Sequence, residues 1–472
     1  MNEKTLNNLA YLYISIPIII FLSGWCKPLI AIPIITLIVL SIIYRIKNTQ
    51  RIDILKYLKK NKKAIIITFL IAAIYVYLSG IGGYVYQNSD HLYRNAVFKE
   101  LVNNPWPIYH KPQGIFNTDT IFVYYFALWL PSALIAKITN IEVGYFILYI
   151  WCLLGVVLTF CYIKKYYKGK SFIPLILFIS FSGLDIVERF LLGKDNLLDM
   201  MTMPIHLEWI GAFQMSSFTT QIFWVFNQAI PAWIITFFML KEEDNRYIGV
   251  ILAMSLIFCT LPAAGLVFIF IYKIFFASLL SKKKKVIKEW LTHTFSWQNI
   301  LIGIPILIIN YLFLKSNLSG NKISFGINEE QYLNVLIIYI YEFGIYYLLT
   351  YKYIDNKPLY WISFISLLIC PLIQIGHSQD FCMRACIPSQ IIMFTFVLET
   401  LCKTRKKNNI IFIILCITLS LGMFTPFNEI QRTIKSTNST THRKYINLSN
   451  SYNSNNFYGN KEDNIFVKYI SK

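Results

Sequence analysis

Long apolar runs constrain this chain more than any other feature of its sequence. The run 64–82, AIIITFLIAAIYVYLSGIG, is long enough to cross a bilayer at about 1.5 Å of rise per residue. Hydrophobic residues make up 56% of the chain and charged residues 14%, a balance that excludes a soluble domain. Because a segment in lipid must satisfy its own backbone hydrogen bonds, we expect an all-α polytopic membrane protein.

Basic clusters between the apolar runs set the expected orientation. They lie at 45–63, 164–170, 282–285 and 403–407. By the positive-inside rule these loops face the cytoplasm, and their expected partner is anionic membrane lipid. The formal net charge of +20 does not indicate a nucleic-acid partner, because the clusters are short and separated by apolar spans.

These clusters predict a multi-pass protein of the cell (plasma) membrane, with a cytoplasmic N-terminus and an extracytoplasmic C-terminus. Residues 1–63 would form a membrane hairpin and a basic cytoplasmic loop, 64–426 the transmembrane core, and 427–472 an outer tail that is loose or forms a small fold. We expect about 13 transmembrane helices. They are 9–24, 28–45, 64–82, 145–163, 171–184, 219–240, 247–261, 263–280, 298–315, 332–352, 358–376, 387–402 and 410–426.

The segment 119–138 is apolar enough to be a further span, yet a crossing there would invert the topology of everything downstream. We therefore favour a juxtamembrane or re-entrant helix that is interrupted at Pro131. Trp129, Tyr124 and Tyr125 would anchor this helix at the interface. Whether the segment spans or re-enters stays open.

Ionisable and aromatic side chains gather on the outer side of this topology, where we expect a site. The candidates lie in three outer loops, 83–144, 185–218 and 377–386: Asp90, His91, Arg94, His206, Glu208, Trp209, Asp380 and Arg384. Each has a plain structural interpretation. Asp90 with Arg94 and Asp380 with Arg384 have the spacing of ion pairs on a helix surface, which contribute about 0.3–0.5 kcal/mol each. The second loop, with His206 and Glu208, could be an interfacial loop that only keeps its polar groups hydrated.

Glu342, inside the apolar run IIYIYEFGIYYLL, is harder to explain structurally. A carboxylate within the membrane is costly and usually faces a cavity or a partner. Its role stays open. The chain has no Walker A loop and no dinucleotide fingerprint, so we assign no nucleotide cofactor.

The order of these features resembles the GT-C superfamily of integral-membrane, polyprenyl-phosphate-sugar-dependent glycosyltransferases. The shared features are an acidic residue just after an early span, a polar stretch, an aromatic and proline-bearing juxtamembrane segment, and a span ending in basic residues at 144–170. The resemblance covers roughly 64–426 and implies a large first outer loop with juxtamembrane helices. Family members often place this loop after their first span, so 1–45 would be an added hairpin.

In that superfamily the acidic residue of the first large outer loop is the catalytic base, which corresponds to Asp90. The resemblance implies transfer of a hexosyl or pentosyl group from a polyprenyl-phosphate donor to a glycan, lipid or protein acceptor of the envelope. Because His91 follows Asp90, the chain lacks the acidic pair of some branches. We assign no metal ligand and no certain cofactor, and dependence on Mg²⁺ or Mn²⁺ stays open.

The candidate residues suit this chemistry. A sugar phosphate already carries a good leaving group, so the site needs a base for the acceptor hydroxyl and cations for the departing phosphate. Asp90 is the candidate base, and direct attack would invert the anomeric centre. Arg384, with Arg94 second, would bind the phosphate through two hydrogen bonds. The other substrate-binding candidates are Asp380 beside Arg384, His91, which would orient the base or the acceptor, and His206, Glu208 and Trp209, which would shape the sugar or acceptor pocket.

Two other function classes fit parts of the sequence. A transporter or flippase of lipid-linked saccharides would use many spans and an intramembrane charge such as Glu342, but no internal repeat stands out and the polar residues gather at one face. An envelope polysaccharide polymerase or ligase acting on a diphosphate-linked oligosaccharide would need more cationic outer loops than this chain has.

Overall fold

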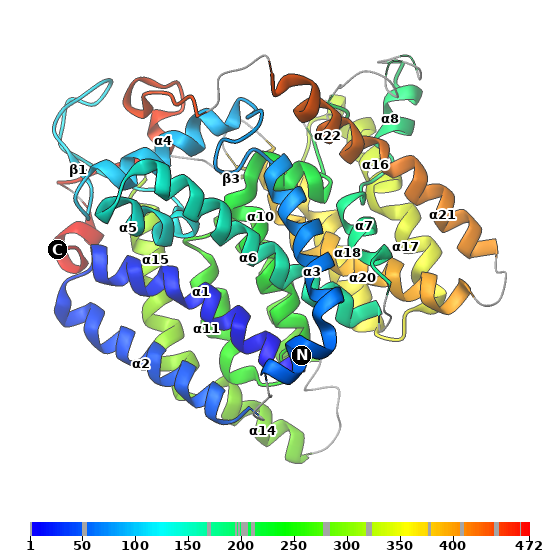
Figure 1. The fold of residues 1–472 in the computed structure, drawn as a ribbon, viewed down its shortest axis with the longest axis horizontal. Coiled ribbons are helices and arrows are strands. Elements are labelled where there is room, and N and C mark those ends of the chain that lie inside the picture. Colours follow the sequence, from blue (N-terminus) through cyan, green and yellow to red (C-terminus); the bar gives the residue numbers. More distant parts are fainter. Residues whose placement is uncertain are drawn as a thin grey trace.

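The chain folds into a bundle of helices, with short strands packed at one end (Figure 1), in a computed structural model. The structure describes residues 2–49, 54–167, 171–193, 196, 199, 206–208, 213–276, 284–317, 323–375, 379–405, 410–438, 443–462 and 464–472. The α-helices are α1 (Glu3–Trp25), α2 (Pro28–Lys47), α3 (Ile54–Leu78), α4 (Asp90–Asn103), α5 (Leu130–Ile138), α6 (Ile141–Tyr167), α7 (Ile173–Ile179), α8 (Asp185–Leu191), α10 (Phe218–Lys241), α11 (Ile248–Ser255), α12 (Thr260–Ile271), α14 (Lys284–Thr294), α15 (Ile304–Lys315), α16 (Tyr332–Ile338), α17 (Ile345–Thr350), α18 (Lys357–Ile369), α19 (Asp380–Ala385), α20 (Ile387–Thr404), α21 (Ile410–Gly422) and α22 (Phe424–Ser436). The strands are β1 (Tyr109–His110), β2 (Thr120–Phe122), β3 (Ile323–Phe325), β4 (Ile373–Ile375) and β5 (Tyr458–Asn460).

Within the described residues, eight helical segments are long and apolar enough to cross a membrane. They are Glu3–Trp25, Pro28–Lys47, Lys59–Leu78, Ile141–Tyr167, Phe218–Lys241, Lys288–Lys315, Glu329–Tyr353 and Ile410–Ser436. Each coincides with one predicted span. The chain is therefore an all-α membrane protein that passes the membrane several times.

The other predicted spans correspond to shorter or more polar elements, so the count of about 13 stays a prediction. Span 171–184 contains only the seven residues of α7, and 247–261 contains the eight residues of α11. Spans 263–280, 358–376 and 387–402 fall on α12, α18 and α20. A helix of eight residues is only about 12 Å long, against about 30 Å of hydrocarbon.

Helix α10 lies at the centre of the bundle, since 94% of the residues in its most apolar stretch are buried in the protein. It packs against α1, α6, α12, α20 and α22. Its backbone breaks at Val225, whose φ of −132° and ψ of 40° lie outside the helical region. Such a break leaves carbonyl groups upstream without their usual helical donors, and they must find other partners.

The segment 119–138 does not form one continuous helix. Thr120–Phe122 is a strand, and α5 has only nine residues, too few to span the membrane. Pro131 lies in the first turn of α5, where proline is tolerated, so the expected interruption at Pro131 is wrong. Trp129 and Tyr124 are buried in the core, which corrects their prediction as interfacial anchors.

One end of the bundle, which we call the cap end, carries a small sheet with the order β1-β2-β5. Strand β5 comes from the C-terminal region and pairs antiparallel with β2, with Ile121 opposite Gly459. The chain end continues this packing, since the Lys472 amide donates to the Trp25 carbonyl at 3.0 Å. The first long loop, the end of α1 and the C-terminal residues therefore lie together at the cap end (Figure 1).

The opposite end, which we call the basic end, collects the start of α1 and the ends of α2 and α10. Lys241 pairs with Glu3 at 3.5 Å, and Arg45 pairs with Glu242 at 2.5 Å. Helix α14 lies at this end as well (Figure 1). The bundle thus separates its strand-bearing cap end from an end rich in basic residues.

Candidate functional site

Helix α4 is fixed at the cap end by the break in α10. The freed Phe223 carbonyl accepts hydrogen bonds from Asn88 Nδ2 at 2.9 Å and from His91 Nε2 at 3.1 Å. The next carbonyl, of Trp224, accepts from Arg94 at 3.4 Å. Asn88, just before α4, and His91 and Arg94, which are three apart and share one face of α4, therefore supply donors to carbonyls that lose their helical partners at the break in α10.

Two Asp–Arg pairs of the same spacing meet near this point. Arg94 binds Asp90 at 3.0 Å, and Arg384, on α19, binds Asp380 at 3.2 Å. Both guanidinium groups are nearly buried, with side-chain exposures of 6% and 10%, while the two carboxylates are 34% and 38% exposed. Because the arginines are shielded from water while the carboxylates stay accessible, these pairs differ from ordinary ion pairs on a helix surface.

A pair of stacked tyrosines joins the two arginines. Arg94 donates to the Tyr124 hydroxyl at 3.0 Å and Arg384 donates to the Tyr125 hydroxyl at 3.2 Å. The two tyrosine rings lie 3.9 Å apart, centroid to centroid. The two hydroxyls also share a hydrogen bond, so one hydroxyl hydrogen of the pair stays available to another acceptor.

These groups line one cavity of about 480 Å³, a volume in the range of small-molecule sites. The cavity therefore brings together four of the predicted site residues, Asp90, Arg94, Asp380 and Arg384, from loops far apart in the sequence. The other described residues that line it are Tyr93, Tyr124, Tyr125, Thr260, Leu261, Leu314, Asn317, Ile375, Asn453, Asn456 and Phe457.

The lining of the cavity suits a ligand that carries an anionic group beside a sugar ring or another group that packs on aromatic side chains. The Nε atoms of Arg94 and Arg384 are buried and have no hydrogen-bond partner among the described residues. Tyr93 and Phe457 stack with their ring centroids 5.9 Å apart and offer a flat apolar wall. Guanidinium donors bind phosphate oxygens well, and aromatic faces pack on sugar rings.

His91 does not reach this cavity. Its Nε2 faces the Phe223 carbonyl, which can only accept, and its Nδ1 lies 3.2 Å from Gln87 Nε2. Burial, together with the charge of Arg94, lowers the pKa of His91 to about 4. A neutral imidazole with both nitrogens occupied holds α4 against α10, so the structure places His91 in a supporting position.

His206 and Glu208 lie in a second polar cluster outside the cavity. His206 Nδ1 contacts Glu429 at 2.8 Å, and Glu208 accepts a hydrogen bond from the Ser217 amide at 2.8 Å. Burial raises the pKa of Glu208 to about 7, against the opposing charge of His206. Trp209, the third residue predicted there, lies outside the described residues.

Trp224 connects this second cluster to the cavity. Its carbonyl accepts from Arg94, while its indole Nε1 donates to Glu429 at 3.0 Å. Glu429 also pairs with Arg432, whose guanidinium lies 5.2 Å from the Trp224 ring centroid. The described residues of the second loop therefore support the arginine of the cavity through α10, and none of them lines the cavity.

Three buried carboxylates form the one described group that could hold a metal ion. Asp185, Glu188 and Glu342 offer oxygen atoms that all lie within 4.8 Å of one another. Asp185 accepts hydrogen bonds from Ser182 at 2.8 Å and from Thr425 at 2.7 Å. Carboxylate oxygens suit Mg²⁺, Mn²⁺ or Ca²⁺. None of the three lines the cap-end cavity, so a metal held there would lie outside the lining that contains Arg384.

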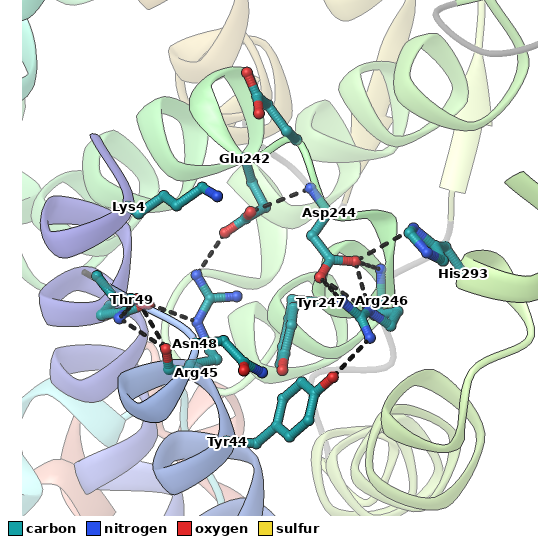
Figure 2. A pocket seen from close by; sticks show the side chains of 12 residues that line it. Lys4, Tyr44, Arg45, Asn48, Thr49, Glu242, Asp244, Arg246, Tyr247 and His293 are labelled. Carbon is teal, nitrogen blue, oxygen red and sulfur yellow. Dashed lines mark hydrogen bonds and ion pairs between the residues drawn. The ribbon is translucent and has the colours of Figure 1, made fainter. Parts of the chain in front are cut away.

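A second cavity, of about 260 Å³, lies at the basic end (Figure 2). Arg45 crosses from α2 to Glu242 and lies 4.1 Å over the Tyr247 ring. Asp244 binds Arg246 at 2.6 Å and lies 3.5 Å from His293. Together with the Lys241–Glu3 pair, these contacts tie α1, α2 and α14 to the end of α10, so we interpret the network as a structural clamp. Arg45, predicted as the last residue of the span 28–45 and the first of the basic cluster, lies at the end of α2 and is buried.

Several residues of the cap-end cavity were not among the sequence candidates. Tyr124 and Tyr125 were assigned to the membrane interface, and Asn453, Asn456 and Phe457 belong to the C-terminal region expected to be a tail. The tyrosine pair had a local signal, since it stands in a loop already rich in candidates. The C-terminal residues had none, because only strand pairing brings them to the cavity.

No family model, no curated protein and no solved structure matches this chain.

Proposed function

We propose that the protein is a membrane glycosyltransferase that moves a sugar from a polyprenyl-phosphate donor to an envelope acceptor at the cap end. The observation that carries the proposal is the single cavity in which Asp90 lies with Arg94 and Arg384. A transfer from a sugar phosphate needs a carboxylate for the acceptor proton and cations for the leaving phosphate. Both are present within one cavity of suitable volume.

The proposed reaction is one displacement. The acceptor hydroxyl passes its proton to the Asp90 carboxylate as its oxygen forms a bond to the anomeric carbon. The bond between that carbon and the phosphate oxygen breaks, and its electron pair leaves with the polyprenyl phosphate. Arg384 and Arg94 stabilise the departing phosphate, and the hydrogen-bonded pair of Tyr124 and Tyr125 supplies one further donor. One in-line displacement inverts the anomeric centre.

The test is the Asp90→Asn variant, which keeps the size of the side chain but removes the proton acceptor. Its sugar transfer should fall by about 10² to 10⁴ fold, the range for general-base catalysis. The measurement is transfer of a radiolabelled sugar from a polyprenyl-phosphate donor, in membranes that contain equal amounts of each variant. Near-normal transfer by Asp90→Asn would exclude Asp90 as the base.

Two matched variants separate the role of Asp90 from loss of charge. Asp380→Asn changes the equivalent carboxylate of the second pair and should cause a smaller loss. Asp355→Asn breaks an exposed ion pair with Lys403 and should leave transfer unchanged. A loss confined to Glu208→Gln would assign the base to the second polar cluster.

The buried carboxylates favour one second candidate, a cation- or proton-coupled transporter of lipid-linked saccharides. Glu342 lies in a membrane-spanning segment beside Asp185 and Glu188, and three carboxylates that close need protons or a cation. In sealed vesicles, this candidate predicts movement of a lipid-linked saccharide between leaflets that Glu342→Gln abolishes and Asp90→Asn does not. The glycosyltransferase proposal predicts the reverse dependence for sugar transfer.

A further inference from the structure

The cap-end cavity continues into an exposed apolar stripe on α15. Four residues of α15, spaced as one helical face, have exposures between 46% and 54%: Ile304, Leu307, Ile308 and Tyr311. Leu314, three residues beyond Tyr311 on the same face, lines the cavity. The other face, which includes Ile306, Ile309 and Phe313, is buried in the core. The stripe therefore runs from the membrane-exposed surface directly to the cavity wall.

Helix α12 starts at the same cavity. Thr260 and Leu261, in its first turn, line the cavity, while Val267 and Ile271 further along are 41% and 36% exposed. Both α12 and α15 pack against α11. The cavity is thus bounded by two helices that carry exposed apolar side chains away from it.

We propose that the isoprenoid tail of the lipid-linked donor leaves the cavity past Leu261 and Leu314 and lies along the α15 stripe. The proposal rests on the proposed function, because it takes the ligand to be a polyprenyl phosphate. An amphiphile of this kind needs an anion site next to an apolar surface. The buried arginines provide the first, and the stripe that ends at Leu314 provides the second.

Helix α21 offers a matched comparison. It carries exposed apolar residues with the same spacing and with exposures between 38% and 68%: Ile410, Ile413, Ile414 and Ile417. None of them lines the cavity. Bulk lipid should cover both stripes equally, whereas a ligand anchored at Arg384 should be enriched only on α15.

The experiment places photoreactive p-benzoylphenylalanine at Tyr311 or Leu307 of the full chain in membranes, and at Ile413 or Ile417 as controls. Because these side chains are exposed, the replacements should leave folding intact. A radiolabelled polyprenyl phosphate is added at low mole fraction, followed by irradiation. We expect labelling on α15 to exceed that on α21 by about tenfold, which corresponds to a preference of about 1.4 kcal/mol. Adding Arg384→Gln should reduce the labelling at Tyr311 to the level at Ile413.

Equal labelling on both helices would overturn the proposal, and so would equal displacement of the probe by phosphatidylglycerol, since the stripe would then contact ordinary lipid. If labelling is equal while transfer still depends on Asp90, the tail lies elsewhere and the proposed function stands. If α15 is labelled in an Arg384-dependent way but no sugar is transferred, the tail site stands and the proposed reaction fails.

Discussion

At the scale of single residues, the cavity depends on how its two arginines are held. Each has its own aspartate one helical turn earlier and one hydroxyl of the stacked tyrosine pair. Such fixed guanidinium groups lose little side-chain freedom when an anion binds, so their directional hydrogen bonds are available at low entropic cost. A lysine in the same place would keep the charge and lose the planar fork of donors.

Arg384→Lys should therefore reduce transfer by about tenfold or more, with an unchanged melting temperature. Transfer is measured at several donor concentrations in membranes with matched protein amounts. Arg246→Lys serves as the control, because Arg246 is also held by an aspartate but lies in the basic-end cavity. Full activity of Arg384→Lys with unchanged donor affinity would move the phosphate site to Arg94.

His206 predicts how stability depends on pH. Burial lowers the pKa of His206, but the hydrogen bond to Glu429 and the charges of Glu208 and Glu429 outweigh burial, so its pKa is raised above 6.5. A raised pKa means that the protonated form stabilises the fold. This stability is complete below about pH 6.5 and is lost as pH rises through the folded-state pKa. The pKa of about 7 for Glu208 acts in the same direction, since ionising that buried carboxyl is unfavourable.

The protein in detergent should melt at a higher temperature at about pH 6 than at about pH 8. His206→Gln should shrink this difference, because it removes the titrating imidazole. Asp355→Asn, which removes an exposed carboxylate from an ion pair with Lys403, serves as the control and should leave the difference as it is. An undiminished difference in His206→Gln would show that the ion pair with Glu429 does not contribute to stability.

At the scale of elements, the cap end depends on close approaches between segments far apart in the sequence. Asn317, at the end of α15, donates to the Asn456 carbonyl at 2.7 Å, which fixes the C-terminal region beside the cavity. Strand β5 comes so close to α15 that a Cβ on Gly459 would lie 2.3 Å from the Ser316 carbonyl oxygen. A backbone oxygen at that distance cannot turn aside as a flexible side chain can.

Gly459→Ala should therefore destabilise the cap end by about 1–3 kcal/mol, the cost of inserting a methyl group into packed structure. The measurement is thermal unfolding in detergent, together with protease cleavage of the C-terminal region. Gly303→Ala is the matched control, because its nearest contact would be 3.4 Å away and alanine favours a helix by about 0.5–1 kcal/mol. Equal stability of the two variants would mean that β5 is not tightly docked.

At the scale of the whole molecule, the two ends of the bundle differ in chemistry. The cap end carries the proposed site, and the basic end carries the ion-pair network of Arg45 and Asp244 (Figure 2). By the positive-inside rule we expect the basic end to face the cytoplasm, so the proposed site would face outward. Under the proposed function, this orientation would make the acceptor an envelope component.

Cysteine labelling in intact cells tests this orientation. In a Cys402→Ser background, Tyr452→Cys should react with an impermeant thiol reagent, because Tyr452 is 96% exposed near the cap end. Lys288→Cys, on α14 at the basic end, should react only after the cells are opened. Labelling of Lys288→Cys in intact cells would invert the orientation and with it the outward-facing site.

Local patterns in the sequence were enough to identify the membrane class and eight of the spans, because crossing lipid requires long apolar helices. The Asp90–Arg94 and Asp380–Arg384 pairs were also predictable from a local pattern, because a spacing of four residues places two side chains together on one face of a helix. Glu342 stood out as an isolated charge in an apolar run.

Only the tertiary structure decided what these local features do together. The break at Val225 exposes two carbonyls that fix α4, and strand pairing carries Phe457 to a cavity more than three hundred residues from Asp90 in the sequence. The same packing turns His91 away from the cavity and gathers Glu342 with Asp185 and Glu188. A sequence pattern reports neighbours along one element, whereas a site is built where several elements meet, and their meeting is set by packing of the whole chain.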